Sequence, residues 1–331
     1  MRLALIGAGR IGKVHAQAID AHPEVTLSAV ADFHAPTAEA LASQYGTRVL
    51  PPDAIFEDGE VDAILIASST PTHADYLERA ARAGKAVLCE KPIALDLART
   101  RDALQVLVAH PVTCALGFNR RHDPQFAALK QSIAEGRIGD LETLSIISRD
   151  PAPPPAEYVG ASGGLFRDMM IHDFDMARWL LDEPIVHVHA EGSCLIDPSI
   201  GEAGDIDTAM VTLVTASGRL CHINNSRRAC YGYDQRIEAF GSAGMLQAQN
   251  ETETRLRFTG EPGQVEETPK WFFLERYADA YRREISDFVG AWKQQREPLA
   301  SASDGLEALR LAEAAECSLR EGRRIALNDI H

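Results

Sequence analysis

At 331 residues the chain is longer than the size at which one hydrophobic core usually stops growing, so two domains are expected. Its composition, 45% hydrophobic and 24% charged, is that of a folded globular protein and excludes disorder on a large scale. The net charge of −15 disfavours nucleic acid and anionic membranes as partners, and the lack of a signal peptide or an 18-residue apolar run predicts a cytoplasmic protein.

The first 120 residues alternate between short aliphatic runs and helical patterns. Strands are predicted at 3–6, 26–31, 63–67, 86–89 and 112–117. A repeating β-α-β unit with continuously apolar strands is typical of a doubly wound parallel sheet. We therefore predict an α/β domain of this type over residues 1–120.

The stretch "ALIGAGRIG" contains a G-x-G-x-x-G motif directly after the first strand and at the start of a helix. Gly7 permits a tight turn, Gly9 lets the backbone approach a pyrophosphate, and Gly12 lets the helix pack closely on the strand. Arg10 and Ile11 lie between these glycines and complete the predicted phosphate loop. By itself the motif also occurs in turns without function.

Asp32 ends the second predicted strand, 20 residues after Gly12, where a carboxylate can accept both ribose hydroxyls of an adenosine. A 2′-phosphate would be repelled there, and neither Arg nor Lys follows in "ADFHAPTAEA". The pattern therefore predicts NAD rather than NADP as the cofactor, and an NAD-binding domain of the Rossmann type over residues 1–120. The alternative role for this carboxylate is to cap the next helix.

A polar loop, "ASSTPTHAD", follows the next central strand. Ligands of open α/β sheets bind at the carboxyl ends of the strands, so this loop is predicted to line the cofactor. Its candidate residues are Ser68, Ser69, Thr70 and His73. Thr72 can in addition cap the helix that begins there.

The predicted strand at 86–89 runs into "VLCEKPIAL", where Glu90 and Lys91 stand at the carboxyl edge of the sheet. We include both residues in the predicted cofactor site, at its nicotinamide end. Residue type alone assigns Lys91 no catalytic role, because an ordinary lysine extends its ammonium group into water.

After residue 140 the pattern changes to successive strand-like runs, several of them with period-2 alternation and Gly-containing turns. They predict a mostly antiparallel, open sheet, whose uncovered face is a candidate surface for self-association. Helices are predicted at 165–181, 272–296 and 303–321. The second domain, residues 121–331, is thus α+β.

The Pro-rich segment 149–164 is either a linker or a lid near the substrate.

The segment "GGLFRDMMIHDFDMARWL" combines apolar and titratable residues. On a helix, Asp168, His172 and Asp175 fall on an arc of roughly 60°, and the apolar side chains lie opposite. This cluster is a candidate active site. Two alternatives stay open: an Asp–His pair that only satisfies a partly buried surface, and a zinc site completed by His187 and His189, without an H-E-x-x-H motif.

Three segments, the N-terminal glycine motif, "CEKPIA" and "RDMMIHDFDMARW", together resemble the glucose-fructose oxidoreductase, inositol dehydrogenase and MocA (Gfo/Idh/MocA) family of nicotinamide-dependent oxidoreductases. The similarity extends along nearly the whole chain. Within the family, "GFNRRHDPQF" and "SRDPAPPP" are most similar to the myo-inositol 2-dehydrogenases. The resemblance implies NAD-dependent oxidation of myo-inositol to 2-keto-myo-inositol by a homotetramer.

The same resemblance implies roles for individual residues. Lys91, Asp168 and His172 match the catalytic positions of the family, in which the lysine often precedes a cis-proline. Contacts with a polyol substrate are implied for Lys91, Arg121, Asp168, His172, Asp175 and Tyr233. The loop "SSTPTH" departs from the common family form, which has an Asn before the His. This departure affects the identity of the side chains in this loop that contact the cofactor, and not the location of the contacts.

Oxidation of a secondary alcohol moves a hydride to the nicotinamide, so the protein must supply a base and the positioning. We expect His172 to take the hydroxyl proton, Asp168 to orient its ring, and Lys91 to hydrogen-bond the reacting oxygen. No metal ion is predicted. The alternatives are another inositol stereoisomer or an aldose as substrate, a zinc hydrolase or isomerase, and an NAD-binding sensor without catalysis.

Overall fold

The computed structural model describes residues 1–261 and 263–331, and the chain divides into two compact units. The first unit comprises Met1–Asp123 and Asp279–Leu309, and the second comprises Pro124–Ala278 and Arg310–His331. The domain change predicted at residue 120 lies close to the first passage between the units. The return of residues 279–309 to the first unit was not predicted, because helical periodicity shows which face is buried but not against which sheet.

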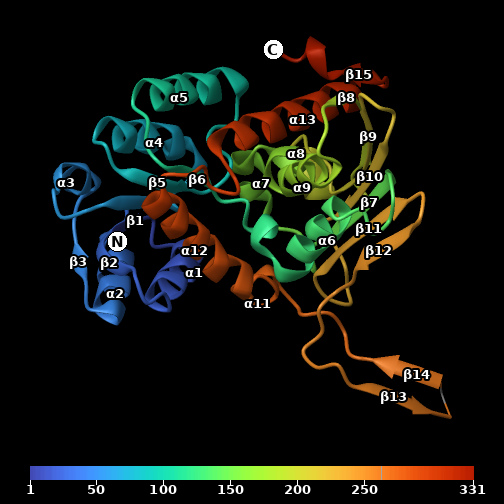
Figure 1. The fold of residues 1–331 in the computed structure, drawn as a ribbon, viewed down its shortest axis with the longest axis horizontal. Coiled ribbons are helices and arrows are strands. Elements are labelled where there is room, and N and C mark those ends of the chain that lie inside the picture. The colour runs from blue at the N-terminus through green and yellow to red at the C-terminus, as the bar shows by residue number, and fades with distance from the viewer. Residues whose placement is uncertain (262) are drawn as a thin grey trace. The chain divides into compact units, whose positions relative to one another are not determined.

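The first unit is built on a six-stranded sheet with the order β3-β2-β1-β4-β5-β6, in which every pairing is parallel (Figure 1). The strands are β1 Arg2–Ile6, β2 Thr26–Ala31, β3 Arg48–Val49, β4 Ala63–Ile66, β5 Ala86–Cys89 and β6 Cys114–Leu116. This order confirms the predicted doubly wound sheet. The strand order reverses between β1 and β4, and ligands of such sheets bind at the carboxyl ends of these strands.

Helices flank this sheet, and their burial explains the apolar strands. They are α1 Arg10–Asp20, α2 Ala35–Tyr45, α3 Pro52–Glu57, α4 His73–Arg82, α5 Leu97–Ala109 and α12 Ala278–Gln294, with the 3₁₀ turns η1 Thr70–Thr72 and η2 Asn119–His122. Leu3, Leu5, Ile64 and Val87 are completely buried. Strands covered on both faces carry no polar alternation, which is why the pattern was recognisable in the sequence.

The second unit contains a seven-stranded sheet with the order β12-β11-β7-β10-β9-β8-β15. Its strands are β7 Leu141–Arg149, β8 Ile185–Ser193, β9 Thr208–Thr215, β10 Leu220–Ser226, β11 Asp234–Gly241, β12 Gly244–Ala248 and β15 Ile325–Ala326. The β7–β10 pairing is parallel and the others are antiparallel, which confirms the predicted mostly antiparallel sheet. A separate hairpin is formed by β13 Arg257–Gly260 and β14 Gly263–Glu266 (Figure 1).

One face of the seven-stranded sheet carries a row of apolar side chains in register. Met245 pairs with Phe240, Phe240 with Thr143, Thr143 with Leu220, and Leu220 with Val214. Directly opposed residues lie on the same face, so these side chains are neighbours. Met245, Phe240 and Leu220 are 49%, 45% and 45% exposed. The predicted open face is therefore present in this chain. We call Met245, Phe240 and Leu220 the apolar row.

The helices of the second unit include the segment predicted to carry the titratable cluster. They are α6 Pro124–Ala134, α7 Ala156–Ser162, α8 Gly164–Asp168, α9 Ile171–Leu181, α10 Pro198–Glu202 and α11 Phe273–Arg276, and α13 Ala302–Glu321 begins in the first unit and ends in the second. The prediction of one helix over 165–181 was wrong, because α8 ends at Asp168 and α9 begins at Ile171. The Leu165 carbonyl accepts both the Met169 and Met170 N–H groups, at 3.0 and 2.9 Å, as is common where a helix ends.

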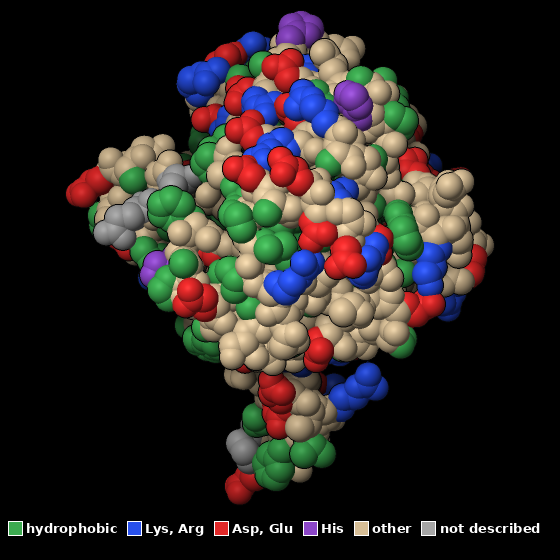
Figure 2. All heavy atoms as spheres, turned by 90° about the vertical axis from the view of Figure 1, so that its left-hand side faces the viewer, with side chains coloured by type: hydrophobic (Ala, Val, Ile, Leu, Met, Phe, Trp, Pro, Cys, Tyr) green, Lys and Arg blue, Asp and Glu red, His purple; other side chains and the backbone are tan. Residues whose placement is uncertain are grey.

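Charged residues of both signs share the surface. Figure 2 shows Asp and Glu side chains interspersed with Lys and Arg over the face that it draws. Within the part of the chain that the structure describes, no helix combines the length and the apolar character needed to cross a bilayer.

Candidate active site

The glycine-rich turn after β1 is packed so closely that two of its three glycines are required by space. Gly7 has φ +105°, and a Cβ there would lie 2.3 Å from the Ala67 carbonyl oxygen. A Cβ on Gly12 would lie 1.9 Å from the Gly7 carbonyl oxygen, whereas a Cβ on Gly9 meets nothing within 4 Å. Gly9 therefore keeps open the space beside the N-terminus of α1, which suits an approaching pyrophosphate.

The Asp32 carboxylate is fixed by the backbone at the carboxyl end of β2. Its Oδ2 accepts the Ala8 N–H at 2.6 Å, and its Oδ1 accepts the His34 N–H at 2.8 Å. A carboxylate has about four acceptor positions, so these bonds leave capacity for ribose hydroxyls. The N-cap of α2 is His34 rather than Asp32. The sequence reasoning overlooked Phe33, whose side chain is fully exposed beside this carboxylate.

The loop after β4 is held together by its own side chains. The Ser68 and Thr72 hydroxyl oxygens are 2.6 Å apart, and the Thr72 hydroxyl donates to the Ser69 carbonyl at 2.8 Å. His73 is 2% exposed, and its Nδ1 and Nε2 lie 2.8 and 3.0 Å from the carbonyl oxygens of Pro92 and Ser68. Ser68, Ser69 and Thr70 thus stand at the predicted edge of the sheet, and His73 lies beneath it.

The turn after β5 contains Glu90 and Lys91, and the Lys91–Pro92 peptide is cis, as the family resemblance implies. The Glu90 carboxylate points into the unit: its Oε1 is 2.6 Å from His15 Nε2, and its Oε2 accepts the Lys91 N–H at 3.3 Å. The Lys91 side chain is half-buried. The structure therefore brings Lys91 and the glycine-rich turn to the carboxyl edge of one sheet.

Two buried carboxyl groups of the first unit have pKa values shifted in opposite directions. Burial acts to raise the pKa of Glu90, but the His15 hydrogen bond and the nearby charges of Lys91 and His73 hold that pKa below its usual value. Burial, and then the charges of Glu90 and Asp287, hold the pKa of Glu284 well above its usual value. The opposite shifts follow from the surroundings: Glu90 has a hydrogen-bonding imidazole beside it, whereas Glu284 is near the carboxylates of Glu90 and Asp287.

Arg121, a predicted substrate contact, is buried inside the first unit, 4% exposed. Its Nη1 donates to the Leu299 carbonyl at 2.7 Å, and its Nη2 lies 3.0 Å from Asp304 Oδ1. Burial acts to raise the pKa of Asp304, but the charge of Arg121 and hydrogen bonds from Arg121 and Ser301 bring that pKa to about 2. This geometry favours a structural role for Arg121, and its contact with substrate stays a prediction.

Asp168, at the end of α8, lies between a phenol and a guanidinium. The Tyr158 hydroxyl donates to Asp168 Oδ1 at 3.1 Å, and Arg227 Nη1 is 3.7 Å from Asp168 Oδ2. Arg227 is 1% exposed, and its Nη2 is 3.7 Å from Asp205. Sequence reasoning missed Tyr158, Arg227 and Asp205, because none of them carries a recognisable motif. Arg227 and Asp205 in addition come from distant segments.

The other predicted residues of the second unit lie on or near α9. His172 is the second residue of α9 and is partly exposed, and Asp175, almost a turn later, is 1% exposed. Tyr233 precedes β11 and packs edge-on against Tyr277, with ring centroids 5.9 Å apart. The Pro-rich segment 149–164 lies within the second unit, so it is not a linker between the units.

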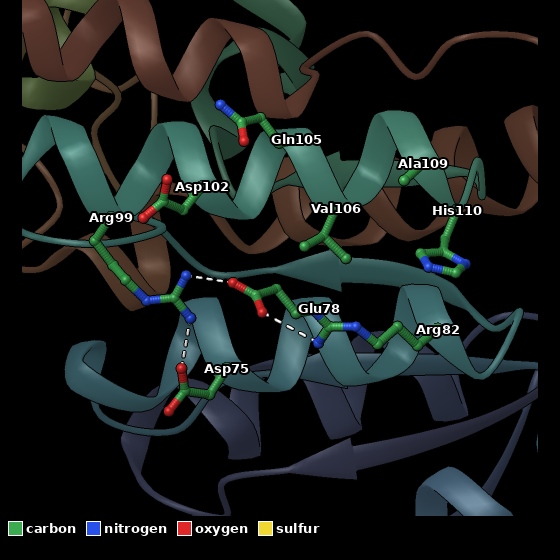
Figure 3. Close-up of a pocket in the computed structure, with 9 residues that line it drawn as sticks. All are labelled: Asp75, Glu78, Arg82, Arg99, Asp102, Gln105, Val106, Ala109 and His110. Atoms are coloured by element: carbon green, nitrogen blue, oxygen red, sulfur yellow. Dashed lines mark hydrogen bonds and ion pairs between the residues drawn. The ribbon is translucent and has the colours of Figure 1, made fainter.

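A groove of about 650 Å³ lies between α4 and α5 in the first unit (Figure 3). Four of its charged side chains bind one another: Arg99 bridges Asp75 and Glu78, and Arg82 Nη1 lies 3.2 Å from Glu78. It contains none of the residues predicted for the site.

The alternative zinc site would need several metal-binding side chains close together. Among residues 1–261 and 263–331, no three His, Cys, Asp or Glu side chains gather as a metal would require. His187 and His189 lie on β8, where His187 Nε2 is 3.5 Å from Arg324 and His189 Nε2 is 3.7 Å from Glu191. The set of Asp168, His172 and these two histidines is thus not assembled.

Comparisons with known proteins match both halves of the chain. A family profile described as an oxidoreductase family with an NAD-binding Rossmann fold matches residues 1–118, and the profile of the Gfo/Idh/MocA C-terminal domain matches residues 126–247. The chain is 49% identical to the inositol 2-dehydrogenase of Rhizobium meliloti (strain 1021) over 327 residues, which cover 99% of each chain.

Solved structures show the same relationship. The crystal structure of a myo-inositol dehydrogenase from Corynebacterium glutamicum ATCC 13032 has a TM-score of 0.95 at 44% identity, and the match covers 99% of both chains. The scyllo-inositol dehydrogenase of Lactobacillus casei, crystallised with NAD(H) and scyllo-inositol, has a TM-score of 0.92 at 29% identity, again over 99% of both chains.

Proposed function

This chain belongs to the Gfo/Idh/MocA family of NAD-binding oxidoreductases, and we propose that it oxidises myo-inositol to 2-keto-myo-inositol with NAD as the hydride acceptor. The observation that carries the proposal is the 49% identity to an inositol 2-dehydrogenase over 99% of both chains. Both halves of the predicted catalytic set are present: Lys91 at the sheet edge of the first unit, and Asp168 with His172 at the α8–α9 junction of the second.

The first unit suits the cofactor. Gly9 leaves space where the pyrophosphate would approach, and Asp32 offers acceptor capacity for the adenosine ribose. An anion there repels a 2′-phosphate, which favours NAD over NADP. When bound, NAD supplies the acceptor for the hydride that leaves the alcohol carbon.

His172 acts as the general base in this proposal. An imidazole titrates near neutral pH and can take the hydroxyl proton as the hydride leaves. Asp168 orients the His172 ring and stabilises its protonated form, and it is itself held by Tyr158 and Arg227. Lys91 donates a hydrogen bond to the reacting oxygen and positions it for transfer.

The substrate is proposed to be a polyol because the predicted contacts are carboxylates and hydrogen-bonding groups. Asp175 and Tyr233 would accept and donate to ring hydroxyls. Relatives of this family differ in the stereoisomer that they are named for, myo-inositol at 44% identity and scyllo-inositol at 29%. Another stereoisomer or an aldose is therefore the second candidate. The non-catalytic sensor is not favoured, since the relatives are named as dehydrogenases.

The experiment is to measure NADH formation over a panel of inositol stereoisomers and aldoses, with NAD and NADP side by side. We expect the highest kcat/KM for myo-inositol with NAD. Turnover of an aldose alone would make the aldose, instead of myo-inositol, the substrate. NAD binding without turnover of any panel member would contradict the dehydrogenase proposal.

We further propose a homotetramer in the cytoplasm. The apolar row supports self-association through the seven-stranded sheet, since a face of this kind is commonly covered by a second copy. Sedimentation of the wild-type chain should show a tetramer, and replacing Leu220 and Phe240 with Ser should shift it toward smaller species. A wild-type chain that sediments as a monomer would contradict this.

A further inference from the structure

Two buried side chains of the first unit hold the backbone of the Lys91–Pro92 turn. On one side, the Glu90 carboxylate accepts the Lys91 N–H at 3.3 Å. On the other side, Nδ1 of His73 lies 2.8 Å from the Pro92 carbonyl oxygen. The turn that presents the Lys91 side chain is therefore bound both before and after its proline.

Glu90 is itself fixed from several directions. Its Oε1 lies 2.6 Å from Nε2 of His15, a fully buried residue whose ring packs edge-on against Tyr281 with centroids 5.3 Å apart. Its backbone N–H donates to the Ile66 carbonyl at 2.9 Å. A Cβ on Gly117 would lie 2.8 Å from Glu90 Oε2, so that side of the carboxylate is closely packed. The carboxylate has little freedom to turn away from Lys91.

His73 connects the turn to the second loop of the predicted cofactor site. Its Nε2 lies 3.0 Å from the Ser68 carbonyl oxygen, in the loop after β4, while Nδ1 faces Pro92. A neutral imidazole donates to one of these carbonyls, and the cation donates to both. His73 is 2% exposed, so this link is made inside the protein rather than at its surface.

Stability alone does not explain why the turn is held in this way. A buried carboxylate–imidazole pair such as His15–Glu90 is seldom more stabilising than well-packed apolar residues of the same volume. What it supplies is a fixed orientation, because each hydrogen bond constrains both partners. The constrained group here is the backbone of the residue that the proposed mechanism uses.

We propose that Glu90 and His73, with His15 behind Glu90, are positioning residues that hold Lys91 for hydride transfer. We call these three residues the Lys91 clamp. This inference rests on the proposed function, in which Lys91 hydrogen-bonds the reacting oxygen. The clamp acts on turnover rather than on NAD affinity, since a small misplacement of a reacting group costs rate without loss of the cofactor contacts.

The first test uses two variants that disturb the carboxylate differently. Glu90→Gln removes the charge and keeps the shape, and Gly117→Ala keeps the charge but pushes on Oε2. We expect kcat for myo-inositol to fall about 10- to 100-fold in both, with the Kd for NADH within about twofold of wild type. The matched controls are Glu57→Gln, an exposed carboxylate, and Gly59→Ala, where an added Cβ meets nothing within 4 Å.

The second test addresses His73. His73→Ala should lower kcat in the same way, and His73→Asn, which restores a donor near the position of Nδ1, should recover part of the loss. His110→Ala, at an exposed histidine of the same unit, is the control and should leave kcat unchanged. A purely structural role predicts a lower Tm without this recovery, and with normal kcat per folded site.

The variant Lys91→Met distinguishes a failure of the Lys91 clamp from a failure of the proposed role of Lys91. If Lys91→Met loses turnover while Glu90→Gln, Gly117→Ala and His73→Ala keep a kcat within about twofold of wild type, the Lys91 clamp is wrong and the proposed function stands. If Lys91→Met itself keeps full turnover, the proposed role of Lys91 fails and the clamp fails with it. Loss of kcat in all four with NADH binding retained supports the inference.

Discussion

The two units present their predicted functional groups by different means. In the first unit, backbone turns at the ends of parallel strands hold Lys91 and the glycine motif, and buried polar side chains fix these turns. In the second unit, Asp168 and His172 stand on two short helices, and Asp168 is held by the side chains Tyr158 and Arg227. In the proposed mechanism, cofactor binding would therefore depend on backbone geometry, and proton transfer on the side chains that neighbour Asp168.

The largest effects are expected from removing one proposed catalytic side chain from each unit. His172→Ala and Lys91→Ala should each lower kcat for myo-inositol by about 10²- to 10⁴-fold, because the base and the hydrogen bond to the reacting oxygen are lost. NADH binding, measured by fluorescence, should persist in both. Near-normal turnover in either variant would remove that residue from the mechanism.

The glycine turn offers a sharper contrast within the first unit. Gly12→Ala should destabilise the fold by about 3 kcal/mol, because its Cβ would lie 1.9 Å from the Gly7 carbonyl oxygen. Gly9→Ala should leave Tm nearly unchanged, since an added Cβ meets nothing within 4 Å, and should weaken NADH binding by filling the pyrophosphate approach. Thermal melts and NADH titrations distinguish the two. If the two variants changed Tm and NADH affinity equally, the packing role of Gly12 and the cofactor role of Gly9 would be contradicted.

Asp32 tests the nucleotide contact alone. Asp32→Ala should weaken NAD binding about 10- to 100-fold and reduce the preference for NAD over NADP, because the acceptor for the ribose hydroxyls and the charge that repels a 2′-phosphate are both removed. Affinities for both cofactors check this. Unchanged NAD affinity would leave Asp32 only its contacts with Ala8 and His34.

A smaller effect concerns acid stability. Burial, with the charges of Arg121 and Arg296, lowers the pKa of His122 to about 4, although Asp287 acts to raise it. Below the ordinary value near 6.5 the unfolded chain takes up a proton first, so the stability contributed by neutral His122 is present above about pH 6.5 and is lost toward pH 4. His122→Gln should therefore lose less stability than wild type between pH 7 and pH 4.5, on the order of 2 kcal/mol. Denaturant melts at both pH values check this, with exposed His110→Gln as the control, and identical pH dependence in wild type and His122→Gln would contradict it.

Much of the first unit could be predicted because its information is local. Gly7, Gly9, Gly12 and Asp32 lie close together in the sequence, and the glycine motif and Asp32 each directly follow a short, mostly apolar strand. In the second unit the helical character of the α8–α9 segment was predicted, but the break after Asp168 was not. Helical periodicity continues through such a break, so it does not reveal where the hydrogen bonding changes.

Contacts between distant segments were beyond prediction. Glu90 meets His15 from 75 residues away, and Asp168 meets Arg227 from another strand end. None of these residues carries a motif for its partner. The burial of Arg121 against Asp304 is of the same kind, since its residue type alone suits either a substrate contact or an internal ion pair.

By itself the sequence determined the parallel and antiparallel sheets, the nucleotide turn and the family, because these depend on residue spacing over one or two elements. Only the tertiary structure decided that residues 279–309 join the first unit, that Arg121 is buried in an ion pair, and that Glu90 and His73 bind the turn of Lys91. The physical reason is that the partner of a buried polar group depends on which distant segments pack against it. Short-range periodicity in the sequence does not indicate which segments these are.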